Sequence, residues 1–398
     1  MLLAIKNYKR IFAAMHKRLL NYITNKRHLA AGLCYLSLSI LFAFWITRLP
    51  EVKHRLDLSE GDLGIALFFI PVGSIISMML TTSLIRKIGE GKTAVYAILA
   101  FSSLAILPFL AVSYTQLCLS LFVLGFTMGW VDISINAVVN TIEKIEKVNI
   151  MSTSHGFFSL GGILGGIIGG LIAGSSISGG VQMVFSCLFV IIIVLLFVRK
   201  HIGNLHDEDN KAEAPLFALP TKPVFVLALI SFCIMTSEGA VTDWSTVYLN
   251  DFLGSSPEMA GFGFAAFSLT MTLGRFGGDH LIYSYGNRGV VFTGSIVALI
   301  GIFLVMMQSI GWSILGFALI GTGYSCVVPV IFSGAAKVKG INPAYGLASV
   351  ASAGFFGFLI GPVLMGLIAE EYGLNNSFFM VLILTIITMA GSWKLNGK

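Results

Sequence analysis

The stretch RKHIGNLHDEDNKAEAPLFALPTK (residues 199–222) divides a chain of 398 residues almost at its midpoint. It is the longest polar break in a sequence that is 56% hydrophobic and only 11% charged. Soluble proteins carry charge on about a quarter of their residues, which is far more than here. The apolar residues of this chain also occur in runs of roughly 20, the length needed to cross a bilayer as a helix. The sequence therefore predicts an all-α protein that crosses a membrane many times.

Six apolar runs precede this break and six follow it. The predicted spans are 28–48, 62–84, 92–112, 114–140, 150–173, 180–198, 222–249, 258–282, 289–308, 311–335, 344–369 and 373–394. We therefore predict twelve transmembrane helices in two pseudo-symmetric six-helix bundles. The predicted parts are a basic N-terminal segment (1–27), an N-terminal half (28–198), a linker (199–221) and a C-terminal half (222–398).

Short repeated motifs relate the two halves to each other. They are GLIAG (170–174) and GLIAE (366–370), HGFFS (155–159) and AGFFG (353–357), and VLGF (123–126) and ILGF (314–317). The members of each pair are 191 to 198 residues apart, so the spans of one half match those of the other in order. Parallel halves of this kind place a solute site near the bilayer midplane, between the halves.

The basic residues occur in alternate loops. The loops near residues 113, 175, 251, 310 and 371 hold no Lys or Arg, whereas both termini and the linker do. By the positive-inside rule, both termini lie in the cytoplasm, and the protein spans the cytoplasmic (inner) membrane. The net charge of +6 is therefore a topology signal and does not indicate a nucleic-acid partner. Residues 1–27 are interpreted as an interfacial basic helix or a loose tail.

The chain resembles members of the major facilitator superfamily over essentially its whole length, and most resembles the YbjJ-like bacterial branch, a distant neighbour of the fucose permeases. The motifs that carry this resemblance are EGAVTDWSTVYL (238–249), VDISINAVV (131–139), HGFFSLGG (155–162) and GRFGGD (274–279). The resemblance implies a two-bundle transporter that works by alternating access.

Polar residues follow one face of the fourth predicted span. Asp132 and Asn136 are four residues apart and therefore lie on the same side of a helix. A polar face in a membrane must contact protein or water, so it is either a helix–helix seam or the wall of a solute cavity in which Asp132 binds solute or carries a proton. His155 begins the next span at a similar depth, and we expect it to approach both residues and to take part in proton transfer. The alternative is a His that merely ends its helix.

Two acids without a nearby basic residue occur in the seventh predicted span. Glu238 and Asp243 are separated by about 140° around a helix, so they should have different partners. Arg48 ends the first span at a depth similar to that of Asp243, and we predict an outer-gate ion pair between them. Glu238 would remain as the unpaired central acid, which makes it a candidate for proton coupling and solute binding. The alternative is that backbone and water satisfy both acids.

Two further groups are candidate functional residues. Arg275 and Asp279 are spaced for an ion pair along the eighth span, where they would act as an inner-gate latch. Trp45, Trp244 and Tyr324 are candidates for stacking on a solute, although packing explains them equally well.

These residues predict a secondary active transporter that carries a small polar solute by alternating access in symport with protons. Sugar-like molecules are among the candidate solutes. Efflux of amphipathic compounds is the alternative, and a membrane receptor on a transporter fold is an alternative of another class. No nucleotide, phosphate-loop or metal-ligand motif is present, so we expect no enzyme, no metal and no cofactor. We expect a monomer in the lipid bilayer.

Overall fold

The computed structural model describes residues 19–206 and 217–395, apart from the side chains of Asp279 and His280. The first half contains α2 (Lys26–Thr47), α3 (Leu49–Arg55), α4 (Glu60–Ile88), α5 (Glu90–Leu104), α6 (Leu107–Leu110), α7 (Tyr114–Glu146), α8 (Met151–Ala173), α9 (Gly179–Ile193), η1 (Val194–Val198) and α10 (Arg199–Ile202). The second half contains α11 (Phe225–Val247), η2 (Tyr248–Phe252), α12 (Pro257–Met306), α13 (Ile310–Tyr324), α14 (Val327–Ala335), α15 (Pro343–Tyr372), α16 (Leu374–Gly391) and η3 (Ser392–Lys394).

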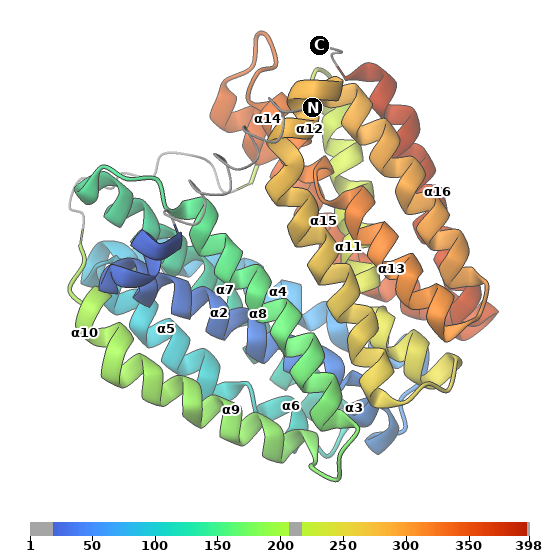
Figure 1. Cartoon of the computed structure of the whole chain (residues 1–398), viewed down its shortest axis with the longest axis horizontal. Helices are drawn as coiled ribbons and strands as arrows, with labels where there is room; N and C mark the ends of the chain where they lie inside the picture. Colours follow the sequence, from blue (N-terminus) through green and yellow to red (C-terminus); the bar gives the residue numbers. More distant parts are fainter. Residues whose placement is uncertain (1–18, 207–216, 396–398) are drawn as a thin grey trace, which may run out of the picture.

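The predicted all-helical membrane fold is confirmed. Eleven helical segments among the described residues are long and apolar enough to cross a bilayer. A further pass comes from α12, because Gly286 has φ 70° and ψ 169° and divides this helix into two parts. The two parts run in opposite directions from this point (Figure 1). The part before Gly286 contains the run predicted as the eighth span.

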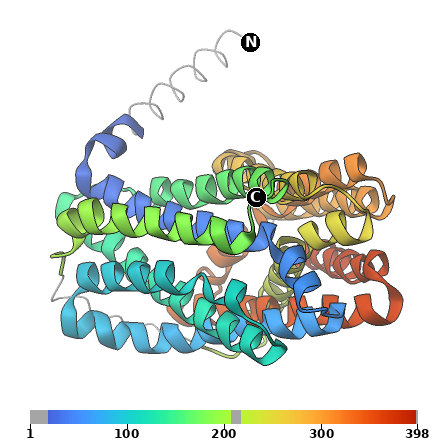
Figure 2. The same ribbon diagram turned by 90° about the horizontal axis from the view of Figure 1, so that it is seen from below.

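The helices form two bundles, one from each half of the chain. Figure 1 shows the bundles meeting near α3 and diverging towards α10 and α14, and Figure 2 shows them lying beside each other. We call the end that contains α3 and η2 the distal end, and the end that contains α10 and α14 the terminal end.

Part of the predicted N-terminal segment is docked on the first bundle. Tyr22 is buried, and its hydroxyl lies 2.8 Å from Oγ of Ser154 in α8. Residues 1–18 and 207–216, which belong to the predicted N-terminal segment and linker, lie outside the described residues.

Two helix pairs join the halves near the distal end, α4 with α15 and α8 with α12. A Cβ atom added at Gly64 would lie 2.7 Å from the carbonyl oxygen of Pro362, and one added at Gly366 would lie 2.9 Å from Cα of Gly64. In the second pair, a Cβ atom at Gly170 would lie 3.0 Å from Cα of Gly261. Backbones can approach this closely only where the residues are small.

We expect Gly64→Ala to destabilise this arrangement, because the added methyl group would meet rigid backbone. Overpacking of this kind costs about 1–3 kcal/mol. The apparent midpoint of thermal unfolding in detergent measures the effect. Gly311→Ala is the matched control, since a Cβ atom there has no neighbour within 4 Å. Equal midpoints for the two variants would contradict a tight crossing at Gly64.

Candidate functional site

A pocket of about 240 Å³ lies between the two halves. Residues of the first half that line it come from α2, α4 and α7, and those of the second half come from α11 and α15. The lining residues are Phe42, Leu67, Ile70, Pro71, Ser74, Ile75, Met78, Met128, Gly239, Thr242, Asp243, Phe355, Phe358 and Pro362. We call this space the central pocket. Its wall is mostly apolar and aromatic.

Asp243 is the one charged residue in the lining of the central pocket. No hydrogen bond or ion pair joins its carboxylate to any side chain that the structure describes. The two lining hydroxyls donate to backbone carbonyls instead, Ser74 to Gly125 at 2.8 Å and Thr242 to Glu238 at 2.8 Å. Asp243 is partly buried in this mostly apolar wall, where a carboxylate without a partner is costly, so it is available to a positively charged group or a proton.

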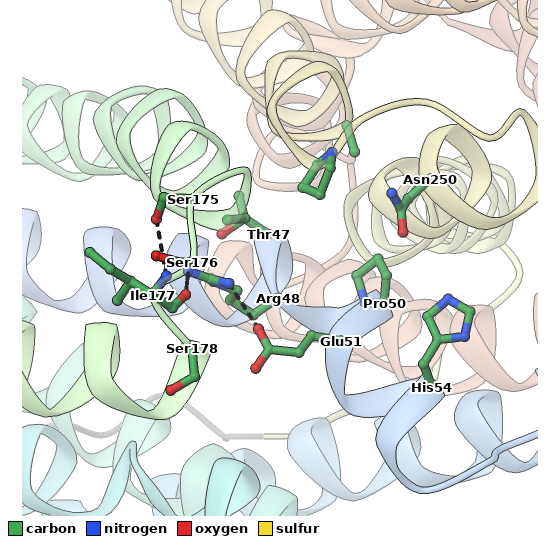
Figure 3. A pocket seen from close by; sticks show the side chains of 13 residues that line it. Thr47, Arg48, Pro50, Glu51, His54, Ser175, Ser176, Ile177, Ser178 and Asn250 are labelled. Carbon is green, nitrogen blue, oxygen red and sulfur yellow. Dashed lines mark hydrogen bonds and ion pairs between the residues drawn. The ribbon is translucent and has the colours of Figure 1, made fainter.

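The structure contradicts the predicted outer-gate pair between Arg48 and Asp243. Arg48 lies at the corner between α2 and α3, and its guanidinium points into its own half. It donates to Gln182 Oε1 at 2.8 Å, to Glu51 Oε2 at 2.9 Å and to the Ile177 carbonyl at 2.9 Å. Figure 3 shows Arg48 with Glu51 and Ile177 in a pocket of about 350 Å³ at the distal end. The two bundles are in contact at this end, so a gate here is closed in this structure. An open gate therefore does not explain why Arg48 and Asp243 are apart.

A different set of charges joins the halves at the distal end. Lys53 in α3 lies 3.0 Å from Asp251 in η2 and 2.9 Å from Glu60 in α4, and His54 lies 3.0 Å from the same Asp251. Burial of the ammonium lowers the pKa of Lys53, but the hydrogen bonds to Glu60 and Asp251 outweigh burial and raise that pKa above its usual value. Nearby, the buried Thr246 hydroxyl donates to the Ile46 carbonyl across the halves at 3.0 Å. This group is the distal latch of the structure.

Glu238 is paired, contrary to the prediction that it is the unpaired acid. Its Oε1 lies 3.2 Å from a guanidinium nitrogen of Arg275 in α12. The side chain of Glu238 is 16% exposed and that of Arg275 is 44% exposed, so this ion pair is partly accessible to solvent. The predicted partner of Arg275 was Asp279, whose side chain lies outside the described part of the chain. The rotation of α11 about its axis turns Glu238 towards Arg275 in α12 and Asp243 towards the central pocket, so the first acid is paired and the second is not.

Asp132 and Asn136 belong to one hydrogen-bonded group. The Asn136 amide donates to Asp132 Oδ1 at 3.1 Å, and the hydroxyl of Tyr35 donates to Asn136 Oδ1 at 2.7 Å. His155 reaches the group through Tyr35, because their ring centroids are 4.8 Å apart. Tyr35 was missed in the sequence, although an isolated Tyr within the apolar first span is a signal for a buried hydrogen bond. We call these four residues the Asp132 group.

The three aromatic residues expected to stack on a solute are enclosed by protein instead. Trp45, Trp244 and Tyr324 are each at most 1% exposed. The ring of Trp45 packs edge-on against Phe109, and the hydroxyl of Tyr324 lies 2.6 Å from Oγ1 of Thr385. In this arrangement they pack the two bundles, and the aromatic residues of the central pocket are Phe42, Phe355 and Phe358.

Comparison with known sequences identifies one family. A sequence profile described as Major Facilitator Superfamily matches residues 28–343 and 227–396. An MFS-type transporter of Yersinia pestis is 32% identical over 354 residues, which cover 88% of this chain and 90% of the relative. Membrane protein MosC of Rhizobium meliloti is 27% identical over 359 residues, which cover 89% of this chain and 86% of MosC.

Solved structures of low sequence identity share the fold. The nucleoside transporter NupG has a TM-score of 0.71 at 15% identity, covering 94% of this chain and 100% of NupG. A D-xylose-proton symporter has a TM-score of 0.72 at 14% identity, covering 94% of this chain and 98% of the symporter. A bacterial Spinster homologue in an inward-facing, unoccupied conformation has a TM-score of 0.74 at 14% identity, covering 94% and 96%.

The raised pKa of Lys53 predicts a pH-dependent distal latch. The ion pairs should hold the distal end closed below the ordinary Lys value of about 10.4, and should be lost as the pH rises through the higher value of the folded protein. Thiol labelling of a Thr246→Cys protein measures opening, because Thr246 is buried at the contact between the halves. Labelling should increase steeply at alkaline pH.

Lys53→Arg in the same Thr246→Cys background is the control, because a guanidinium keeps its charge at that pH. The control also corrects for the greater reactivity of the thiolate. If labelling rises equally with Lys53 and with Arg at this position, the latch does not depend on the ammonium charge.

Proposed function

Because the chain belongs to the Major Facilitator Superfamily, we propose that it carries a small polar solute across the cytoplasmic membrane by alternating access, in symport with protons. The observation that carries this proposal is the central pocket. Both halves line it, it contains the unpartnered Asp243, and the halves are latched on its distal side. A pocket shared by two bundles is open to one side or the other as the bundles rock about it.

The distribution of Lys and Arg supports an orientation with the terminal end in the cytoplasm. The distal latch then lies on the outer side, and the divergence of the bundles towards the terminal end corresponds to an inward-facing arrangement (Figure 1). In this orientation Lys53, Glu60 and Asp251 form the outer gate.

The proton is assigned to Asp132. Its Oδ1 accepts one hydrogen bond from Asn136, and the group extends through Tyr35 to His155, which is exposed. An exposed imidazole can exchange protons with water at physiological pH. The hydrogen bond from Asn136 holds the carboxylate in place, and Tyr35 in turn holds Asn136 by donating to its Oδ1. Asp132 and Asp243 lie in different halves, so the proton and the solute have separate acids.

Export of an amphipathic compound is the second candidate function. It is favoured by the apolar lining of the central pocket, where only Ser74, Thr242 and Asp243 carry polar side chains. The direction of net movement in right-side-out vesicles with an imposed pH gradient distinguishes the two functions.

We expect Asp132→Asn to abolish accumulation driven by a pH gradient while leaving exchange of labelled solute intact, because the amide cannot carry a proton. Proteoliposomes with and without a pH gradient measure both activities. The control is Glu371→Gln, which neutralises an exposed acid at the distal end. An Asp132→Asn protein that still accumulates solute with pH as the sole driving force would disprove this assignment.

Glu238→Gln in the same assay tests the other acid. If this variant loses pH-driven accumulation and retains exchange, the proton is carried at the Glu238–Arg275 pair. If it retains both activities, the pair only supports the structure.

A further inference from the structure

The polar groups of the central pocket define which solutes it can hold. Ser74 and Thr242 already donate their hydroxyl protons to backbone carbonyls, so the described wall offers acceptors and one free carboxylate. A sugar would exchange several hydrogen bonds with water for very few with this wall, at a cost of a few kcal/mol for each unsatisfied group. An anion would meet the charge of Asp243 unfavourably. A cation would be attracted to it.

The rest of the pocket wall suits an apolar body. Phe42, Phe355 and Phe358 line it together with Met78 and Met128. Aromatic faces attract cations as well as apolar surfaces, and Met side chains adapt to ligands of different shape. The volume of about 240 Å³ is slightly below the range of roughly 300–1,000 Å³ typical of pockets for drug-sized ligands. The pocket therefore fits a molecule of about one ring.

A second apolar pocket continues the central pocket. It has a volume of about 460 Å³, and it shares Ile75 and Phe355 with the central pocket. Its wall includes the end of the linker, residues 217–220, which lies against α11 and α15. The linker is held there by hydrogen bonds from the amide of Ala218 to Ser352 Oγ at 3.1 Å and from the hydroxyl of Tyr345 to the Leu219 carbonyl at 3.0 Å.

Ile75 and Phe355 line both pockets, so the region between the linker and Asp243 is walled by apolar side chains. A molecule that approaches Asp243 from the linker side would meet this apolar wall before its charged group reaches the carboxylate. A strongly hydrated polyol or a compact ion would lose its hydration along the way without compensation. An organic cation with an apolar body loses less free energy, because burial of its apolar surface against this wall offsets part of the lost hydration of its charged group.

We propose that the central pocket binds a small organic ammonium ion with an aromatic or aliphatic body, its nitrogen paired with Asp243 and its body against Phe42, Phe355 and Phe358. This inference rests on the proposed function, transport of a small solute by alternating access, and among the candidate solutes it selects an amphipathic cation over a sugar. The ammonium donates hydrogen bonds to the carboxylate, and such charge-assisted bonds are about twice as strong as neutral ones. Neutral molecules of the same shape lack this contact.

Calorimetric titration of the purified full-length protein in lipid nanodiscs tests the proposal. Four probes separate charge from body: 2-phenylethylammonium, the neutral 2-phenylethanol, the polar ethanolammonium and the anion phenylacetate. We expect 2-phenylethylammonium to bind at least tenfold more tightly than each of the other three. Asp243→Asn should reduce its affinity at least tenfold and should leave the affinity of 2-phenylethanol nearly unchanged. Phe358→Ala should weaken both ligands.

Two variants exclude a folding defect as the cause. Asp243→Glu keeps the charge and should retain preference for the ammonium, and Glu371→Gln removes an exposed acid and should bind like the wild type. Equal affinity for 2-phenylethanol and 2-phenylethylammonium, an unchanged affinity in Asp243→Asn, or binding of none of the probes would overturn the proposal.

The measurement needs no gradient, so its failure is distinguishable from failure of the proposed function. An ammonium ion that binds through Asp243 without being transported would overturn the transport proposal and leave this inference standing. Proton-driven accumulation of a neutral polyol by the Asp243→Asn protein would support the transport proposal and overturn this inference.

Discussion

The close approach of backbones at Gly64–Gly366 and at Gly170–Gly261 is the constraint on which the rest of the structure depends. Lipid is as apolar as most side chains, so helices in a bilayer associate through packing and hydrogen bonds rather than through the hydrophobic effect. Two crossings without side chains between them give α4 with α15 and α8 with α12 the contact area they need. They also fix the distance between the halves, and with it the width of the central pocket.

The internal repeat explains why there are two such crossings. Gly170 and Gly366 begin the repeated motifs GLIAG and GLIAE, so the same position serves in both helix pairs. The last position of the motif differs, Gly174 in one copy and Glu370 in the other. Glu370 lies against Gly61 in the first pair, whereas Gly174 lies against Glu258 in the second. At each crossing, therefore, one Glu side chain faces one glycine. In the first pair the repeated motif contains the Glu, and in the second pair it contains the glycine.

The sequence predicted the features that depend on one helix or on repetition. The spans, the two bundles and the shared face of Asp132 and Asn136 all follow from hydropathy and helical phase. The phase of α11 also indicated correctly that Glu238 and Asp243 have different surroundings. The small size of the repeated glycines indicates that another backbone can approach them closely. The helix positions that approach them, Gly64 and Gly261, could not be predicted from the sequence.

Features that depend on how helices are rotated against each other were not predictable in this way. Matching depth suggested Arg48 as the partner of Asp243, but α2 ends at Thr47 and the corner turns Arg48 towards α9. Likewise, Arg275 could pair along its own helix or with α11, and the distance to Glu238 is set by the crossing of two helices. Depth is a one-dimensional measure, whereas an ion pair requires agreement in three dimensions.

The separation of Asp132 from Asp243 bears on how the proposed transporter would couple two cargoes. One carboxylate cannot hold a proton and an ammonium ion together, but two carboxylates in different halves can be neutralised at the same time. An unneutralised acid is costly wherever rocking of the bundles removes it from water. Loading of both acids would therefore lower the barrier to the next conformation, and loading of one alone would leave a charge to be buried. In this scheme coupling needs no direct contact between the proton and the solute, because the cost of the remaining charge links them.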